Sequence, residues 1–166
     1  VALALATLSA EPGRGKRHTL RHPDGPITLI DESYNANPAS MKAALSLLDA
    51  TPVNGKGRRI AVLGDMLELG VHSAALHAGL ADLIAGTRTD VTLLAGPEMK
   101  SLAEALPEGM SFEYRRGADE LKPVLIDIVR PGDVVMIKSS KGIGFSKLVY
   151  ALIRQFPAGA GSATPS

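Results

Sequence analysis

Short apolar runs alternate with longer amphipathic segments along most of this chain. The apolar runs, such as IAVL, VTLL and VVMI, are rich in branched side chains, which is typical of buried strands. The longer segments repeat apolar residues at intervals of three and four, which predicts helices with one buried face. The predicted strands span residues 27–30, 59–63, 91–95, 111–114 and 134–137. The predicted helices span residues 38–50, 73–85, 99–106, 119–129 and 145–156.

The order of these elements indicates one fold class. Strands that are apolar at every position must be covered on both faces, as in a parallel sheet between two layers of helices. Right-handed crossovers between successive strands then predict an α/β domain with a Rossmann-like, doubly wound, mostly parallel sheet and helices on both faces. A further strand at 18–20 precedes the first, and the Asp24-Gly25 pair between them predicts a hairpin.

The stretch 28–48, TLIDESYNANPASMKAALSLL, carries the clearest candidate chemistry. A strand ends in two acids, Asp31 and Glu32, and a polar loop leads to Pro38, which suits the first helical position with Asn37 as the cap. In an open α/β sheet such a loop lies at the carboxyl edge, where ligands bind. The helix N-terminus could bind an anion, and a carboxylate could bind a ribose hydroxyl or a metal-bound water. An ordinary capped helix after a strand would have the same pattern.

Further loops follow other strands of the predicted sheet and are expected at the same edge. One is LGDMLELG at 63–70, another is KSSKGIGFSK at 138–147, and a third lies at 95–99. None is a G-x-G-x-x-G fingerprint or a GxxxxGK[ST] P-loop, so each could be an ordinary turn between a strand and a helix. His72 and His77 are five residues apart, which disfavours a shared metal ion on one helix face.

A basic segment with several glycines precedes the sheet. Arg14, Lys16 and Arg17 lie within four residues, and glycines beside them would let the backbone approach a ligand. An arginine in this setting could hold a phosphate with two hydrogen bonds. A solvated hinge between domains is the alternative, because surface charge is common.

Composition narrows the function classes. The 166 residues are 45% hydrophobic and 21% charged with a net charge of +1, so nothing favours nucleic acid or an acidic membrane surface as a partner. The absence of cysteine excludes disulfides and thiolate metal sites, and it fits a cytoplasmic protein. No apolar run approaches the roughly 18 residues that membrane insertion as a helix requires.

The domain organisation is predicted from turn-rich and low-complexity segments. We expect residues 1–13 to be the end of a preceding domain and a linker, and residues 14–156 to be one folded domain. Residues 157–166 are rich in Pro, Gly, Ala and Ser, which predicts a disordered tail. The chain does not begin with methionine, so we expect it to be a piece of a longer one.

The motifs at the predicted edge resemble those of one enzyme family. DESYNANPASMKAAL is similar to the DDSYNANPxSMxxAL signature of the Mur ligases, specifically the MurF type, with Glu32 in place of the usual second aspartate. PGRGKRHTL resembles the interdomain PGRGxR segment of these ligases, and GDMLELG resembles their motif after the second strand. KSSKGIGFSK resembles their VKGSNGS-type segment less closely, since Ser139 replaces the usual glycine.

This resemblance implies the C-terminal domain of an ATP-dependent ligase of peptidoglycan precursor synthesis in the cytoplasm, with roles in cell-wall biogenesis, cell shape, the cell cycle and cell division. Such enzymes add D-Ala-D-Ala to UDP-MurNAc-tripeptide through an acyl phosphate. The P-loop and the main Mg²⁺ ligands would belong to a central domain outside this sequence. We therefore expect a monomer whose partners are its substrates and its own N-terminal and central domains, and a fragment that is inactive alone.

The resemblance also assigns roles residue by residue. The residues near ATP would be Arg17, then Arg14, and also Asp31, Glu32, Asn35 and Asn37. The residues near the peptide substrates would be Tyr34, Asp65, Met66, Glu68, Leu69, Lys138 and Ser140. The loop at 95–99 would help to select the incoming dipeptide, and we expect no metal site in this chain.

Other functions stay open. A sister ligase, such as folylpolyglutamate synthase or another Mur enzyme, would share the domain and use a different amine. A non-enzymatic Rossmann-type binding module would have the same fold without partner domains. A nicotinamide-dependent dehydrogenase is disfavoured, because the glycine fingerprint of its dinucleotide site is missing.

Overall fold

The computed structural model describes residues 15–53 and 55–157 of the chain. Its strands are β1 (Lys16–His22), β2 (Gly25–Glu32), β3 (Arg59–Gly64), β4 (Val91–Ala95), β5 (Phe112–Arg115) and β6 (Val134–Lys138). Its α-helices are α2 (Pro38–Ala50), α3 (Ser73–Ala78), α4 (Leu80–Ala85), α5 (Lys100–Ala105), α6 (Ala118–Ile128) and α7 (Ser146–Gln155). Its 3-10 helices are η1 (Gly70–His72) and η2 (Lys141–Ile143). The predictions for residues 1–13, Arg14 and nearly all of the tail lie outside the described residues.

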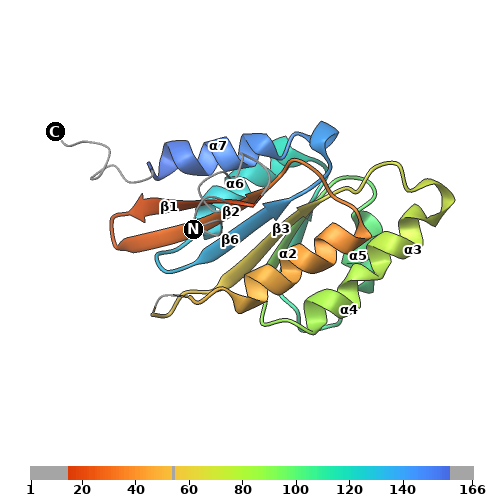
Figure 1. The fold of residues 1–166 in the computed structure, drawn as a ribbon, viewed down its shortest axis with the longest axis horizontal. Coiled ribbons are helices and arrows are strands. Elements are labelled where there is room, and N and C mark those ends of the chain that lie inside the picture. Colours follow the sequence, from red (N-terminus) through yellow and green to blue (C-terminus); the bar gives the residue numbers. More distant parts are fainter. Residues whose placement is uncertain (1–14, 54, 158–166) are drawn as a thin grey trace, which may run out of the picture.

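The strands form one six-stranded sheet in the order β1-β2-β6-β3-β4-β5 (Figure 1). The β1 strand runs antiparallel to β2, and every other neighbouring pair is parallel. The predicted α/β fold with a mostly parallel sheet is therefore confirmed. Strand and helix boundaries differ from the predicted ones by one or two residues at most ends, which is the usual uncertainty of such boundaries.

Helices cover both faces of the sheet, with α6 and α7 on one side and α2, α4 and α5 on the other (Figure 1). The β3 strand shows why its sequence is apolar throughout. Ile60 and Val62 belong to the core beside α6 and α7, whereas Ala61 and Leu63 belong to the core beside α2 and α4. All of these side chains are fully buried, so each successive position of the strand faces a hydrophobic layer.

The N-terminal hairpin differs from its prediction in the position of the turn. His22 pairs with Gly25, so the two-residue loop is Pro23-Asp24 and not Asp24-Gly25. Gly25 is the first residue of β2, and its φ of +152° is a conformation that other residues rarely adopt. The His22 ring stacks on Phe156 at 5.4 Å between centroids, which fastens the hairpin to the end of α7.

The helices begin and end where local chemistry dictates. Asn37 caps α2 and Pro38 occupies its first turn, as predicted. The predicted single helix at 73–85 is instead two short helices, α3 and α4, which are separated at Gly79. Glycine stabilises a helix less than any residue except proline, so a periodic apolar pattern across it overestimates the continuity.

Because β6 lies between β2 and β3, neighbouring loops at the carboxyl edge lead to opposite faces of the sheet. β6 lies between β2 and β3, and its loop leads to α7 on one face of the sheet. The loops after β2 and β3 lead to α2, α3 and α4, and α2 and α4 cover the other face. In open α/β sheets ligands bind where neighbouring loops part in this way.

Candidate functional site

Lys138, the last residue of β6, holds the loop that follows β2. Its side chain is buried, and its ammonium donates a 2.9 Å hydrogen bond to the carbonyl oxygen of Asn35. Glu32 Oε1 lies 3.8 Å from the same nitrogen, which is longer than a hydrogen bond. Burial lowers the pKa of Lys138 and raises the pKa of Glu32, while their mutual attraction opposes both shifts. Burial therefore outweighs attraction in this loose ion pair.

The loop after β2 is shaped by local hydrogen bonds. The Asp31 carboxylate is buried, and its Oδ1 accepts hydrogen bonds from the Ser33 backbone N–H at 3.0 Å and the Ser33 hydroxyl at 2.6 Å. Asn37 and Ser40 form a reciprocal capping box at the start of α2, with bonds of 2.8 and 2.9 Å. Asn35 and Asn37 are exposed residues at this helix N-terminus, and the Oδ1 of each accepts a 2.8 Å hydrogen bond from a backbone N–H, that of Ala36 and that of Ser40.

Ser140 joins the loop after β2 to the loop after β3. Its hydroxyl donates a 3.3 Å hydrogen bond to the Ala36 carbonyl and accepts a 2.8 Å bond from the Leu67 N–H. Its own backbone N–H donates to the Asp65 carbonyl at 3.1 Å. The Ser140 side chain is buried, so these bonds replace contacts with water.

Asp65 lies beneath the loop after β3 and fixes the next loop along the sheet. Its carboxylate is buried and accepts a 2.9 Å hydrogen bond from the Met99 N–H. Burial raises the pKa of Asp65, whereas hydrogen bonds from the backbone of Glu98 and Met99 oppose that rise. Gly96 has a φ of +117°, and a side chain there would overlap the Asp65 carboxylate. The structure thus places Asp65 as a support of the 95–99 loop.

His77 supports the same region from α3. The imidazole is fully buried, and its Nε2 accepts a 2.9 Å hydrogen bond from the Met66 N–H. Its Nδ1 lies 2.8 Å from the Ser73 carbonyl oxygen, so the neutral tautomer with its proton on Nδ1 satisfies both contacts. The Ser73 hydroxyl donates to Glu98. Glu98 belongs to the 95–99 loop that was predicted to help select the dipeptide. The sequence prediction assigned no role to Ser73, although the interval of four between Ser73 and His77 places them on one helix face.

The residues predicted to face the substrates divide into buried and exposed ones. Asp65 and Met66 are buried, at 2% and 1% exposure, whereas Glu68 is exposed and Leu69 is half-buried. Glu68 has a φ of +63°, a left-handed conformation that a residue with a side chain adopts at some cost. Leu67 is 41% exposed beside it. Only the tip of this loop therefore reaches solvent.

A cavity of 160 Å³ lies on the α7 side of the edge. The Lys141 ammonium lies 5.1 Å from the centroid of the Tyr34 ring, a cation–π distance, and both residues line the cavity. The full lining is Asp31, Ser33, Tyr34, Lys141, Ser146, Val149 and Tyr150. Tyr34 was predicted as a substrate residue, while Lys141, Ser146 and Tyr150 were not.

The Arg17 side chain contacts the end of α2, although its position on β1 lies near the carboxyl end of β2. It is exposed on β1, and its guanidinium donates a 3.3 Å hydrogen bond to the hydroxyl of Thr51, the residue that ends α2. The adjacent strand position is Ile30, next to Asp31. The predicted contact of Arg17 with ATP phosphates stays a prediction, and Arg14 lies outside the described residues.

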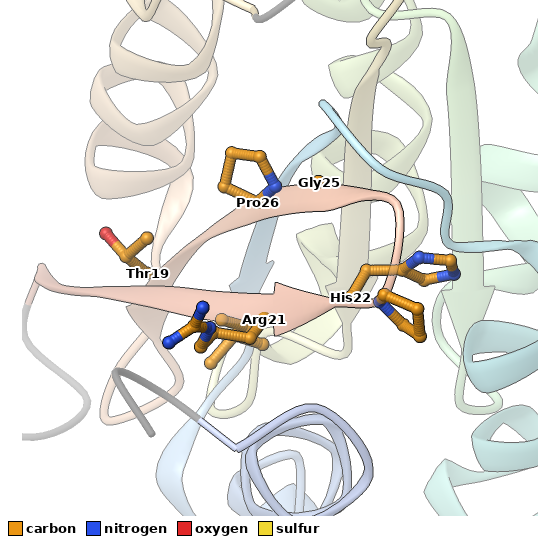
Figure 2. Close-up of a pocket in the computed structure, with 7 residues that line it drawn as sticks. Thr19, Arg21, His22, Gly25 and Pro26 are labelled. Atoms are coloured by element: carbon orange, nitrogen blue, oxygen red, sulfur yellow. The ribbon is translucent and has the colours of Figure 1, made fainter. Parts of the chain in front are cut away.

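A larger hollow of 420 Å³ lies elsewhere, at the N-terminal hairpin. Figure 2 shows that its lining comes from β1, β2 and the turn between them, at the opposite end of β2 from the polar loops. The lining residues are Thr19, Leu20, Arg21, His22, Pro23, Gly25 and Pro26. None of the predicted site residues is among them, so the carboxyl edge is the candidate functional site.

Known proteins resemble this chain over most of its length. The chain is 32% identical over 145 residues to the UDP-N-acetylmuramoyl-tripeptide–D-alanyl-D-alanine ligase of Rickettsia prowazekii, covering 87% of this chain and 31% of that protein. It is 33% identical over 171 residues to the enzyme of the same name from Mycobacterium leprae, covering 92% and 32%. The chain therefore spans about a third of the length of these curated relatives.

Solved structures share the fold. The MurF ligase from Thermotoga maritima in complex with ADP superimposes with a TM-score of 0.71 at 24% identity, over 92% of this chain and 33% of that one. MurF from Acinetobacter baumannii gives 0.70 at 24% identity, over 88% and 31%. The family model described as "Mur ligase, glutamate ligase domain" matches residues 16–141. The sequence-based resemblance is confirmed, and the chain belongs to the Mur ligase family.

Proposed function

We propose that this chain is the C-terminal domain of an ATP-dependent ligase that adds D-Ala-D-Ala to UDP-MurNAc-tripeptide. The observation that carries the proposal is an identity of 30–33% with enzymes named for that reaction, over 84–92% of the chain. The DESYNANP segment that resembles their signature lies at the carboxyl edge described above. The whole enzyme would contain further domains, since the chain spans about a third of its relatives.

In the proposed reaction, the terminal carboxylate of the tripeptide takes the γ-phosphoryl group of ATP and becomes an acyl phosphate. The amine of D-Ala-D-Ala attacks the acyl carbon, inorganic phosphate leaves, and a peptide bond forms. This chemistry makes a cytoplasmic precursor of peptidoglycan, so we also propose a role in cell-wall synthesis and, through it, in cell shape, the cell cycle and cell division.

The loop after β2 suits a nucleotide. Asn35 and Asn37 present exposed amides, and α2 directs the positive end of its dipole to the same place. Asp31 and Lys138 are buried and bonded within the protein, so they would act by shaping the loop. Glu32 is only partly buried and would contribute the carboxylate for a hydroxyl contact.

The loop after β3 and the cavity beside Tyr34 suit the peptide substrates. Glu68 and Leu69 would reach them from the tip of the loop, while Asp65 and Met66 hold that tip from below. Ser140 touches both loops and would keep the nucleotide and peptide sides at a fixed distance.

Magnesium is the metal that the proposed reaction would use. No three His, Cys, Asp or Glu side chains of the described residues come together as ligands. We therefore assign the Mg²⁺ of the proposed reaction to the other domains of the full-length enzyme and derive no step from it here.

The test is a ligation assay with the full-length protein. With UDP-MurNAc-tripeptide, ATP and Mg²⁺, we expect phosphate release to depend on D-Ala-D-Ala, and mass spectrometry to detect the pentapeptide product. L-glutamate, diaminopimelate and D-alanine serve as alternative amines. Preference for one of these would assign the chain to a sister ligase, and absence of any ligation would overturn the proposal.

A further inference from the structure

The described structure contains one side chain whose hydrogen bonds directly bridge the two loops that the proposed function gives to different ligands. The Ser140 hydroxyl bonds Ala36 of the loop after β2 and Leu67 of the loop after β3. These partners are 104 and 73 residues away in sequence. Ser140 is 6% exposed, so the hydroxyl is directed inward and not toward a ligand.

We propose that Ser140 is a positioning residue that couples the nucleotide loop to the peptide loop, so that binding of one ligand favours binding of the other. The inference rests on the proposed function, because that function decides which ligand each loop meets. It assigns Ser140 no contact with substrate. Its role is instead to transmit the position of residues 33–37 to residues 65–69.

The geometry makes this coupling specific to the hydroxyl. The hydroxyl uses its proton on the Ala36 carbonyl and a lone pair on the Leu67 N–H, so a shift of either loop must lengthen a bond to the other. Each loop also has an anchor of its own. Lys138 bonds the Asn35 carbonyl, and His77 bonds the Met66 N–H. Removing the hydroxyl should therefore uncouple the loops without releasing either one.

The neighbouring serine provides a matched control. Ser139 is also fully buried, and its hydroxyl donates a 3.1 Å hydrogen bond to the carbonyl of Ser140. That bond stays within the same segment and bridges no loops. Ser139→Ala thus removes a buried hydroxyl one position away, and it reproduces the general cost of the substitution without the proposed effect.

The decisive measurement is calorimetric binding to the full-length protein. The Kd of a non-hydrolysable ATP analogue is measured with and without saturating UDP-MurNAc-tripeptide and D-Ala-D-Ala. In the parent protein we expect the peptide ligands to tighten nucleotide binding about 5-fold or more, which is the usual range of coupling between sites. Ser140→Ala should reduce that ratio to about 1, and Ser139→Ala should preserve it.

Hydrogen exchange supplies an independent readout that needs no ligand. In the 166-residue chain, Ser140→Ala should speed hydrogen exchange of the Leu67 amide more than Ser139→Ala does, when the two variants are compared under conditions in which they are equally stable. The inference would be overturned if Ser140→Ala left the ratio of the two Kd values unchanged. It would also be overturned if the parent protein showed no coupling between the two ligands. If the parent protein fails to bind D-Ala-D-Ala or to ligate it, the proposed function fails instead. If Ser140→Ala does not fold, Ser140→Cys takes its place: it keeps the shape of the side chain but has only a weak donor and acceptor, so it should also reduce the ratio toward 1, and an unchanged ratio would overturn the inference.

Discussion

The amino and carboxyl edges of the sheet each contain a charged pair with one buried and one partly buried partner, and the two pairs differ in how completely they are hydrogen-bonded. At the amino edge, the Asp133 carboxylate is 1% exposed and accepts bonds from the Arg58 backbone, from the Arg58 side chain at 2.9 and 3.3 Å, and from the Arg130 N–H. At the carboxyl edge, Lys138 and Glu32 lie 3.8 Å apart. The Asp133 carboxylate accepts four hydrogen bonds from described residues, two of them from the Arg58 side chain, whereas the 3.8 Å between Lys138 and Glu32 is longer than a hydrogen bond.

Because of this difference in hydrogen bonding, we interpret the amino-edge pair as structural and the carboxyl-edge pair as one that shapes the candidate site. Arg58 also bonds the Ile128 carbonyl at 2.6 Å, so the amino-edge pair links the start of β3, the approach to β6 and the end of α6. Nothing about it requires a ligand. At the carboxyl edge, burial shifts the pKa of both Lys138 and Glu32 toward their neutral forms. Perturbed pKa values of this kind are more common at sites where a protein binds a ligand or catalyses a reaction than at purely structural ion pairs.

The largest effect on stability should come from breaking the amino-edge pair. Asp133→Ala leaves the Arg58 guanidinium half-buried without its carboxylate, and it also removes the acceptor of two backbone N–H groups. We expect the free energy of unfolding to fall by about 3 kcal/mol, which lowers Tm by roughly 6–12 °C for a domain of this size. Urea denaturation followed by circular dichroism measures this change.

A surface pair provides the control for that prediction. Glu113 lies 3.0 Å from Arg115, with side chains 49% and 39% exposed, so Glu113→Ala should cost less than about 1 kcal/mol. Equal losses of unfolding free energy for Asp133→Ala and Glu113→Ala would mean that burial does not increase the contribution of the amino-edge pair to stability. In the full-length enzyme, Asp133→Ala should also leave the KM values for all substrates unchanged.

Breaking the carboxyl-edge pair should change substrate binding by the full-length enzyme as well as the stability of the domain. Lys138→Met removes the hydrogen bond to the Asn35 carbonyl, for a stability loss of about 2 kcal/mol, and it frees the nucleotide loop. We expect the KM for ATP to rise about tenfold, which corresponds to about 1.4 kcal/mol of binding. Lys122→Met, at an exposed lysine of α6, should change neither quantity. A large stability loss with unchanged kinetics would make Lys138 as purely structural as Asp133.

The sequence predicted the edge but not its internal bonding. Because Ile60 to Leu63 are apolar at every position, the sequence indicates a strand covered on both faces, and parallel strands bring their following loops to one edge. Asn37 and Pro38 likewise predict the start of α2 to within a few residues. These predictions are confirmed because they depend on local chemistry or on the topology of a parallel sheet.

The remaining features depend on partners that are distant in sequence. Lys138 bonds the backbone of a residue 103 positions away, and Asp65 bonds the N–H of Met99, 34 positions away. No local pattern distinguishes a lysine that turns inward from one that faces a ligand. For the same reason the sequence gives no sign that Arg17 reaches Thr51. The assignment of these residues to ATP or peptide contact therefore stays a prediction.

A smaller effect should appear in the pH dependence of stability at Asp65. Burial raises its pKa above the ordinary value of 3.8, so between those two values the folded state binds more protons than the unfolded state. Stability from this group is therefore greatest below pH 3.8 and declines as the pH rises through the folded-state pKa. Asp65→Asn cannot titrate, and the parent protein should lose stability relative to it as the pH rises from 4 to 7. A constant difference, measured by urea denaturation at each pH, would mean that the Glu98 and Met99 hydrogen bonds cancel the effect of burial.

The smallest effect on stability should come from Arg17, which pairs with Ile30 on β2 and contacts Thr51 at the end of α2. Arg17 is an exposed residue and its hydrogen bond to Thr51 is long at 3.3 Å, so Arg17→Ala should change the free energy of unfolding by less than about 0.5 kcal/mol. Thr51→Val removes the same bond from the other side, together with the 2.7 Å bond that the Thr51 hydroxyl donates to the Leu47 carbonyl. If Arg17 holds phosphate when the domains of the full-length enzyme close, Arg17→Ala alone should reduce kcat/KM for ATP. Equal kinetic losses in the two variants would instead mean that Arg17 acts through the end of α2, and the nucleotide site would then be confined to the loops after β2, β3 and β6.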